Sequence, residues 1–496
     1  MRPHAVVALL LAATALVAGC DDTQARPDGM VVETESGPVV GVDAGGVESW
    51  LGIPYAAPPV GELRWRPPEP AASWDEPLDA TEYGPGCLQA KPTPLTESLI
   101  GVDRTDEDCL TLNVHRPAGD ADDLPVMVWI HGGGFVYGSG SQPTYNSPEL
   151  VKRGIVLVTL NYRLGRLGFL AHPALEEGDD HVGNFGLLDQ VAALQWVQDN
   201  ITAFGGDRDN VTVFGESAGG MSVNALMSSP EAEGLFDRAI SESGLGREPS
   251  QDWDAALADG VRTFEPLVGE DPSAEDLRDL DGADVVALST DLLVGEAPLL
   301  DDALPRSVSE TFEAGAEAAV PYLTGTTDLE FPDAAVKAVR DPEQWRAEVL
   351  GALGADALAV YGTRAELDLH VLSDVVFTEP ARHLALEHAA TASSYRYLFT
   401  IAPQALLDQF GGAPHTSEIP FVFDDTRRLG VDVPHADALA DGVADLWVDF
   451  ATDGEPDGWP PAGSGQIMTF TPDGPLVEES DPWRARLDLL EQAARG

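Results

Sequence analysis

The pentapeptide Gly-Glu-Ser-Ala-Gly at residues 215–219 constrains the fold of this chain more than any other feature. A short apolar run at 211–214 precedes it, and a segment without proline, 218–227, follows it. The run predicts a buried strand and the segment predicts a helix. Glycines two positions before and after the serine permit a turn so tight that larger side chains would collide. The pattern therefore predicts a strand, a sharp turn and a helix, with Ser217 presented at the turn as a nucleophile.

Buried strands and helices alternate along much of the chain. Short apolar runs predict strands at 126–130, 154–160, 211–214, 319–325 and 394–399. Apolar residues recur at helical spacing over 184–200 and 437–450, and the acidic, alanine-rich segment 252–317 is also expected to be helical. This alternation indicates an α/β fold with a mostly parallel central sheet flanked by helices. Because no repeat or low-complexity linker divides the chain, we expect one large domain with helical insertions.

A glycine-rich segment, His-Gly-Gly-Gly-Phe at 131–135, directly follows the predicted strand 126–130. Acyl transfer requires N–H donors that point at the oxyanion of the tetrahedral intermediate, and successive glycines let backbone N–H groups approach a substrate closely. We predict an oxyanion hole formed by the N–H groups of Gly133, Gly134 and Ala218. A flexible turn is one alternative. A phosphate loop is another, although no Gly-Lys-Ser/Thr follows.

The charge balance narrows the possible partners. The chain has 84 acidic and 28 basic residues, a formal net charge of −56. Nucleic-acid binders need clustered Lys and Arg, so we expect no nucleic-acid partner. Acidic residues occur along the whole chain, which indicates a highly soluble surface of the kind that suits a salty medium; steering of cationic substrates is the alternative. His and Cys show no metal-site spacing and no dinucleotide fingerprint is present, so we expect no metal and no cofactor.

The N-terminus predicts export. An apolar stretch at 5–17 is shorter than a typical transmembrane helix, and small residues follow it. Val17-Ala18-Gly19-Cys20 resembles a bacterial lipobox, whose cysteine is lipidated and becomes the new N-terminus. We expect a lipoprotein-type signal peptide at 1–19, lipidation of Cys20 and a polar tether at 20–30. The product would be a cell-envelope lipoprotein or a secreted protein, with membrane contact only through the lipid. An ordinary secretory signal with a chance cysteine is the alternative.

Cys87 and Cys109 are the two cysteines that remain after Cys20. A pair of cysteines in an exported chain is expected to form a disulfide, although two separate buried thiols are the alternative. The disulfide would close a loop of about two dozen residues and contribute roughly 3 kcal/mol in the chain-entropy model.

Several further motifs accompany the serine and glycine motifs. They are Trp50-Leu51-Gly52-Ile53-Pro54-Tyr55-Ala56 with Pro58-Pro59-Val60-Gly61, Glu107-Asp108-Cys109-Leu110-Thr111-Leu112-Asn113-Val114, Asn161-Tyr162-Arg163 and Gly183-Asn184-Phe185-Gly186. In this combination, from about residue 31 to 460, the chain resembles the type-B carboxylesterases, the family of carboxylesterases and cholinesterases. The resemblance implies a single α/β-hydrolase domain over 31–496 and pairing of Cys109 with Cys87.

The resemblance also implies a triad in the order nucleophile, acid, base. The histidines after Ser217 are His370, His383, His388, His415 and His435. The segment 412–423, Gly-Ala-Pro-His-Thr-Ser-Glu-Ile-Pro-Phe-Val-Phe, resembles the histidine segment of the family and lies in a Gly/Pro-rich loop, which makes His415 the predicted base. His383 and His388 fall in a helical stretch and are interpreted as surface or packing residues.

The family register makes Glu330 the predicted acid, a few residues after the strand at 319–325. The family usually has an acidic residue before this glutamate and a glycine after it, whereas this chain has Leu329 and Phe331. Asp328 lies two residues before Glu330, and in extended geometry both side chains would point the same way, so Asp328 stays open as the acid. By resemblance, Glu216 and Ser243 are accessory residues, and Ser243 supports the acid.

These expectations describe a serine hydrolase that cleaves small-molecule carboxylic esters through an acyl-enzyme on a Ser-His-Glu triad. A lipase or amidase with the same triad is an alternative. A non-catalytic adhesion or binding protein on the same fold is another, because fold does not fix function. The segment between Cys87 and Cys109 contains no Trp, Tyr or Phe. In cholinesterases that loop gives an aromatic surface for the quaternary ammonium, so a generic short-chain ester is favoured over a choline ester.

Overall fold

A computed structural model describes residues 30–90, 102, 104–119, 121–176, 181–247, 252–289, 298–337, 341–353, 356–429 and 433–495. The predicted signal peptide, Cys20 and the tether up to residue 29 lie outside the described residues. No helix within the described ranges is long and apolar enough to cross a bilayer.

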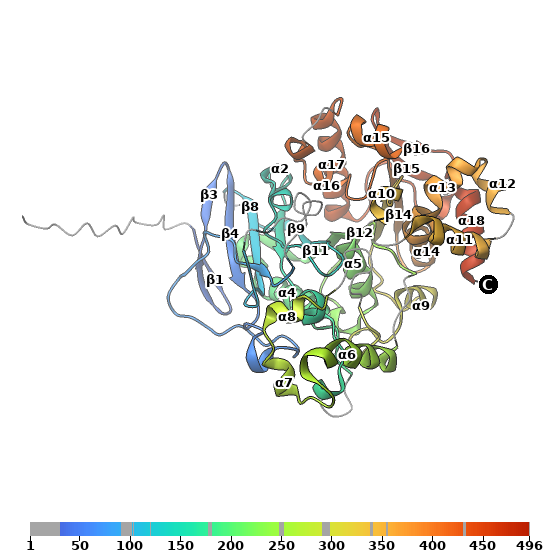
Figure 1. Cartoon of the computed structure of the whole chain (residues 1–496). Helices are drawn as coiled ribbons and strands as arrows, with labels where there is room; N and C mark the ends of the chain where they lie inside the picture. Colours follow the sequence, from blue (N-terminus) through green and yellow to red (C-terminus); the bar gives the residue numbers. More distant parts are fainter. Residues whose placement is uncertain are drawn as a thin grey trace, which may run out of the picture.

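In the described part of the chain, the centre of the molecule is an 11-stranded sheet with the order β16-β15-β14-β13-β12-β11-β9-β10-β8-β4-β3 (Figure 1). The neighbours from β10 to β15 in this order pair in parallel, and the strands beyond them at both edges pair antiparallel. The prediction of a mostly parallel sheet is confirmed. The strands are β3 (Val42–Ala44), β4 (Val47–Pro54), β8 (Thr111–Pro117), β9 (Leu124–Ile130), β10 (Val156–Leu160), β11 (Gly206–Glu216), β12 (Arg238–Glu242), β13 (Tyr322–Thr327), β14 (Ser394–Phe399), β15 (Ile467–Thr471) and β16 (Gly474–Glu478).

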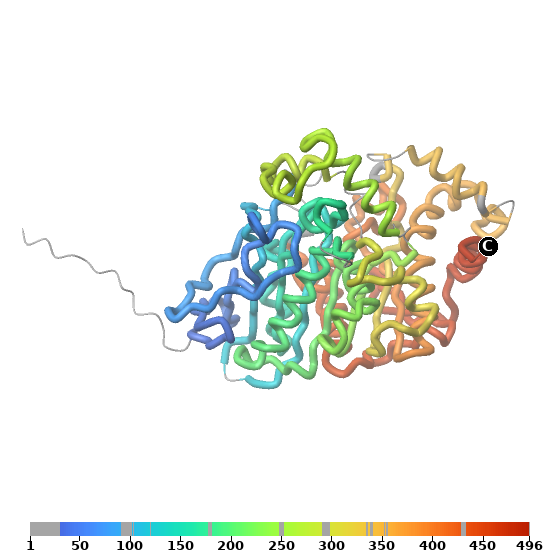
Figure 2. The backbone as a smooth tube through the Cα atoms, turned by 90° about the horizontal axis from the view of Figure 1, so that it is seen from below, coloured from blue at the N-terminus to red at the C-terminus, as the bar shows by residue number. Residues whose placement is uncertain are grey.

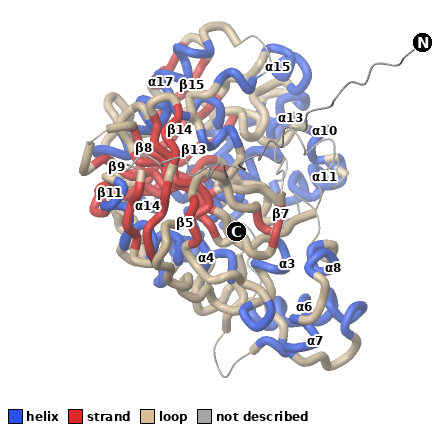
Figure 3. Tube along the Cα trace, turned by 90° about the vertical axis from the view of Figure 1, so that its left-hand side faces the viewer, coloured by secondary structure: helices blue, strands red, loops and turns tan. Residues whose placement is uncertain are grey.

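The central strands are apolar on both faces because both faces are covered. Val126, Val128 and Ile130 of β9 belong to one buried cluster, whereas Met127 and Trp129 belong to another. Successive side chains of a strand point to opposite faces, so these two clusters are the two sides of the core. Figure 3 shows the strands in the interior with helices around them.

Helices on each side of the sheet supply the apolar residues that fill these clusters. The first cluster contains residues of α4 (Phe185–Asn200), α5 (Ala218–Ser228), α9 (Val308–Glu313) and α14 (Glu379–His388). The second contains residues of α2 (Pro148–Val151), α16 (Ile419–Val422) and α17 (Ala436–Asp453). The helices predicted at 184–200, 218–227 and 437–450 correspond to α4, α5 and α17.

Two groups of helices lie outside this three-layer core, as expected for helical insertions. One comprises α6 (Trp253–Val268), α7 (Ala274–Arg278) and α8 (Gly282–Val286). The other comprises α10 (Asp333–Val336), α11 (Pro342–Leu353), α12 (Ala357–Tyr361) and α13 (Arg364–Ser373), which pack with the C-terminal α18 (Arg484–Arg495). Both groups lie along the upper edge of the view in Figure 2.

The N-terminal part adds smaller elements. A three-stranded sheet contains β1 (Val31–Thr34), β2 (Gly37–Val40) and β5 (Leu78–Asp79), and a short parallel pair contains β6 (Gly86–Cys87) and β7 (Thr105–Asp106). Cys87 and Cys109 form a disulfide with Cα atoms 4.9 Å apart, so the predicted pairing is confirmed. The remaining short helices are α3 (Gly165–Gly168) and α15 (Gln404–Phe410).

Candidate active site

The turn that carries Ser217, the predicted nucleophile, lies between β11, which ends at Glu216, and α5, which begins at Ala218. Ser217 has φ 58° and ψ −123°, a strained backbone conformation that the surrounding packing must maintain. A Cβ on Gly219 would lie 2.0 Å from the carbonyl oxygen of Ile130, and one on Gly215 would lie 2.6 Å from that same oxygen. No side chain fits at either glycine, which is the physical reason for the sequence pattern.

The glycine-rich segment after β9 lies beside this turn. A Cβ on Gly132 would lie 3.2 Å from the Cβ of Ser217. Gly133 and Gly134 have φ values of 110° and 62°, in the region that favours glycine. Among the described residues, the N–H groups of Gly133, Gly134 and Ala218 donate no hydrogen bond to the protein. These groups are therefore free to donate to a substrate oxygen.

Glu330 contacts His415 and is held by two donors. Its Oε2 is hydrogen-bonded to Nδ1 of His415. Its Oε1 accepts from Oγ of Ser243 at 2.6 Å and from the N–H of Thr327 at 2.7 Å. Glu330 is 1% exposed, so these bonds replace the water that its carboxylate would otherwise bind. The arrangement fixes the imidazole with Nε2 pointing away from Glu330.

The other ring nitrogen of His415 faces Glu216. The distance from Nε2 to Oε1 of Glu216 is 3.1 Å. Within the described residues, no hydrogen bond joins His415 to Oγ of Ser217. The ring of His415 thus lies between two carboxylates, although Oε1 of Glu216 accepts no hydrogen bond among the described residues. Active-site hydrogen bonds often tighten only when substrate binds.

The two carboxylates set the charge of the site. Burial raises the pKa of Glu216 to about 7, although His415 opposes this shift. Burial lowers the pKa of His415, but Glu216 and Glu330 outweigh burial and raise it to about 10. Neighbouring groups that interact this strongly titrate as a unit. The two carboxylates therefore strongly stabilise the imidazolium form of His415.

Two phenylalanines pack beside the imidazole. The ring of Phe377 lies 5.1 Å and that of Phe331 lies 6.3 Å from the ring of His415, between centroids. The two phenyl rings contact each other edge to face at 4.7 Å. Phe377 lies on a π-helical turn, Asp374–Thr378, between α13 and α14, and such turns are frequent at functional sites. Phe331, which stands where the family usually has glycine, thus forms part of an apolar wall beside His415.

The other candidate histidines lie elsewhere. His388 is fully buried, with Nδ1 2.8 Å from Oε1 of Glu317 and Nε2 2.8 Å from the carbonyl oxygen of Val320. His383 is also buried, 3.3 Å from Glu313. Both are packing residues, in agreement with one of the two interpretations. His370 and His435 have no contact with Glu330 or Ser217 among the described contacts.

The site contains buried residues that the motifs did not reveal. Glu418 lies three residues after His415 and is fully buried, 3.4 Å from Oγ of Ser243. Glu242, at the end of β12, is also fully buried and accepts a hydrogen bond from Nε1 of Trp447 at 2.8 Å. Their closeness to Ser243 and His415 in sequence was the only signal, because glutamates at these positions could as well be exposed.

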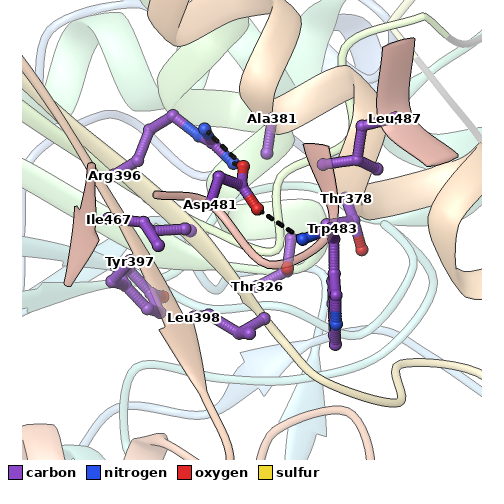
Figure 4. A pocket seen from close by; sticks show the side chains of 11 residues that line it. Thr326, Thr378, Ala381, Arg396, Tyr397, Leu398, Ile467, Asp481, Trp483 and Leu487 are labelled. Atoms are coloured by element: carbon purple, nitrogen blue, oxygen red, sulfur yellow. Dashed lines mark hydrogen bonds and ion pairs between the residues drawn. The ribbon is translucent and has the colours of Figure 1, made fainter. Parts of the chain in front are cut away.

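A small cavity lies between β13, β14 and the C-terminal segment, with Asp481 paired to Arg396 (Figure 4). It has about 10 Å³ of space, enough for one water molecule at most. Neither Ser217 nor His415 lines it. This cavity is therefore not the ester-binding site.

Residues 28–349 and 343–480 match the sequence profile of the Carboxylesterase family. The chain belongs to that family. Para-nitrobenzyl esterase of Bacillus subtilis (strain 168) is 37% identical over 479 residues, which cover 91% of this chain and 96% of the relative. Fumonisin B1 esterase of Sphingopyxis macrogoltabida is 36% identical over 506 residues, which cover 93% of this chain and 89% of the relative.

Solved carboxylesterase structures share the fold. A PNB esterase structure has a TM-score of 0.83 at 35% identity and covers 93% of this chain and 99% of its own. A Geobacillus stearothermophilus carboxylesterase has a TM-score of 0.80 at 34% identity, with the same coverage. This carboxylesterase family member therefore has the predicted α/β-hydrolase fold, and it is a serine hydrolase that cleaves carboxylic esters.

Proposed function

We propose that Ser217, His415 and Glu330 are the catalytic triad of this esterase. His415 takes the hydroxyl proton of Ser217 through Nε2 while Oγ attacks the ester carbonyl carbon. The C=O π bond opens, and its electron pair becomes the oxyanion. The N–H groups of Gly133, Gly134 and Ala218 donate to that oxygen, and the N-terminus of α5 adds a favourable dipole.

The collapse of the tetrahedral intermediate breaks the bond to the alcohol. His415 gives its proton to the departing alkoxide, which leaves an acyl group on Ser217. Water then attacks this acyl-enzyme, with His415 as base, and a second collapse releases the carboxylic acid and regenerates Ser217. All proton transfers occur between His415 and reacting oxygens, so the cycle needs no cofactor.

Glu330 holds the tautomer of His415 that keeps Nε2 available to Ser217 and offsets the imidazolium charge. Ser243 supports Glu330 by donating to Oε1 at 2.6 Å. The observation that carries the proposal is the contact of Glu330 with Nδ1 of His415. Nε2 of the same ring lies 3.1 Å from Glu216, the residue directly before Ser217 on the strained strand–helix turn. It rests on three segments, around 217, 330 and 415, that are far apart in sequence.

We propose neutral short-chain esters as the substrates. The Cys87–Cys109 segment carries no aromatic residue for a quaternary ammonium, and the wall beside His415, Phe331 and Phe377, is apolar. A panel of p-nitrophenyl esters of increasing acyl length, together with a thiocholine ester, tests this. The proposal expects the highest kcat/KM with a short acyl chain and little turnover of the thiocholine ester. A preference for the thiocholine ester or for long acyl chains would refute it.

We propose that the enzyme is an exported lipoprotein, with a signal peptide at 1–19, lipid on Cys20, a tether at 20–30 and one catalytic domain over 31–496. The lipobox-like sequence Val17-Ala18-Gly19-Cys20 supports the anchor. The disulfide between Cys87 and Cys109 supports passage through an oxidising compartment. Intact-mass analysis of the membrane fraction should find a diacylglyceryl-modified N-terminus at Cys20, whereas an unmodified mature N-terminus would refute the anchor.

A further inference from the structure

The backbone of Ser217 is hydrogen-bonded to the end of β12, the strand next to β11. The N–H of Ser217 donates to the carbonyl oxygen of Glu242 at 2.9 Å, where β11 and β12 pair in parallel. A Cβ on Gly220, in the first turn of α5, would lie 2.7 Å from that same oxygen. The carbonyl of Glu242 is therefore the hydrogen-bond acceptor that holds Ser217 in its strained conformation.

The side chain of Glu242 is in turn fixed by a tryptophan on the other side of the core. Nε1 of Trp447, in α17, donates to Oε1 of Glu242 at 2.8 Å. Both residues are 0% exposed. The indole of Trp447 packs against the rings of Tyr397, Trp459 and Phe470, which fix its position. The indole N–H thus connects α17 to the strand end that holds Ser217.

The surroundings of Glu242 disfavour a charged carboxylate. Among the described residues, Glu242 forms no ion pair, and its Oε2 has no hydrogen-bond partner. The ionisable groups that face it are Glu216 on β11, Glu418 before α16, Tyr145 in the turn Pro143–Asn146 and Tyr397 on β14. None of them supplies positive charge. Burial raises the pKa of Glu242 to about 8, although the Trp447 hydrogen bond opposes this.

We propose that Glu242 is a positioning residue for the nucleophile and that it acts as an uncharged carboxylic acid held by the indole of Trp447. In this form Oε1 accepts from Trp447 while the backbone carbonyl of Glu242 accepts from Ser217. The uncharged acid adds no further negative charge beside Glu216. The proposal rests on the assignment of Ser217 as the nucleophile.

Trp447→Phe tests the hydrogen bond from Trp447 to Glu242, because it keeps an aromatic ring in the core and removes the indole N–H. Trp50→Phe is the matched control, since Nε1 of Trp50 is also buried but donates to the carbonyl oxygen of Met30, and Trp50 lies in the other buried cluster of the core. Activity is measured with a p-nitrophenyl ester, and active sites are counted by stoichiometric organophosphate labelling. We expect kcat per labelled site to fall about tenfold in Trp447→Phe with KM unchanged. Trp50→Phe should lower Tm to a similar extent and keep kcat.

Variants of Glu242 test its protonation state. Glu242→Leu should lower kcat per site about tenfold, and Glu242→Gln, which keeps an uncharged acceptor for Trp447, should restore most of it. The acidic limb of the kcat/KM–pH profile should stay in place in Glu242→Gln. A displaced limb would show that Glu242 is charged and would overturn that part of the proposal.

The outcomes separate this proposal from the triad assignment. If kcat per labelled site is unchanged in Trp447→Phe, or falls equally in Trp50→Phe, the positioning role is wrong while the triad stands. If the wild-type enzyme is not labelled at Ser217, the triad assignment itself fails. Should Trp447→Phe not fold, the comparison of Glu242→Leu with Glu242→Gln still decides, because a carboxyl without a positioning role would give equal kcat in both.

Discussion

Oδ1 of Asp328 accepts a hydrogen bond from the N–H of Ala413 at 2.6 Å. The loop that carries Glu330 is thereby joined to the loop that carries His415. Two backbone bonds run between the same loops, from the N–H of Leu329 to Ala413 at 3.2 Å and from that of His415 to Glu330 at 3.4 Å. Asp328 therefore contacts the backbone of the histidine loop, and Glu330 contacts the imidazole.

We expect Glu330→Gln to lower kcat by roughly 10³ to 10⁴ with little change in KM, because a neutral amide fixes the tautomer poorly and does not offset the imidazolium. Asp328→Asn should lower kcat far less, since the amide oxygen can still accept a hydrogen bond from the N–H of Ala413. Steady-state kinetics of both purified variants with one p-nitrophenyl ester provide the comparison. If the two variants exchange phenotypes, Asp328 is the acid and Glu330 is not.

The sequence alone predicted the strand–turn–helix around Ser217, the parallel sheet and the disulfide. The first two depend on local patterns of apolar residues and glycines, and the disulfide follows from the number of cysteines in the chain. The extended geometry in which Asp328 and Glu330 would point the same way is not present. Extended geometry stops at Thr327, and a turn follows at 328 and 329.

Contacts that depend on tertiary packing had no sequence signal. Glu242 and Trp447 are 205 positions apart, and nothing in either segment indicates the other. Similarly, the position of Glu216 beside a ring nitrogen of His415 depends on how two distant loops meet. Periodicity reports which face of an element is buried, but it does not report which polar side chains meet there.

Glu216→Gln should move the acidic limb of the kcat/KM profile to lower pH. The carboxylate of Glu216 raises the pKa of His415, so its removal lets the neutral base persist at lower pH. Plateau kcat should fall by about tenfold, because the imidazolium loses one of two carboxylate neighbours. Glu313→Gln, which removes a carboxylate 3.3 Å from the distant His383, is the control and should leave the profile in place. If the acidic limb of the Glu216→Gln profile stays in place or moves to higher pH, Glu216 does not raise the pKa of His415.

Removing the disulfide should destabilise the enzyme without changing its chemistry. Replacing Cys87 and Cys109 with serine removes a cross-link between residues separated by 22 positions, a loss of roughly 3 kcal/mol in the chain-entropy model. Thermal unfolding with and without a thiol reductant should show a lower Tm that no longer responds to the reductant, and kcat at low temperature should be kept. A Tm equal to that of the oxidised wild type would show that the cross-link contributes no stability.

The assignment of Ser217 as nucleophile is the central claim, and the most direct measurement is mass spectrometry of the enzyme after reaction with an organophosphate, together with ester hydrolysis by Ser217→Ala. We predict one adduct, located on Ser217, and a loss of kcat of about 10⁶ in a variant that keeps the wild-type fold by circular dichroism. An adduct on another serine, or near-normal hydrolysis by the variant, would contradict the account.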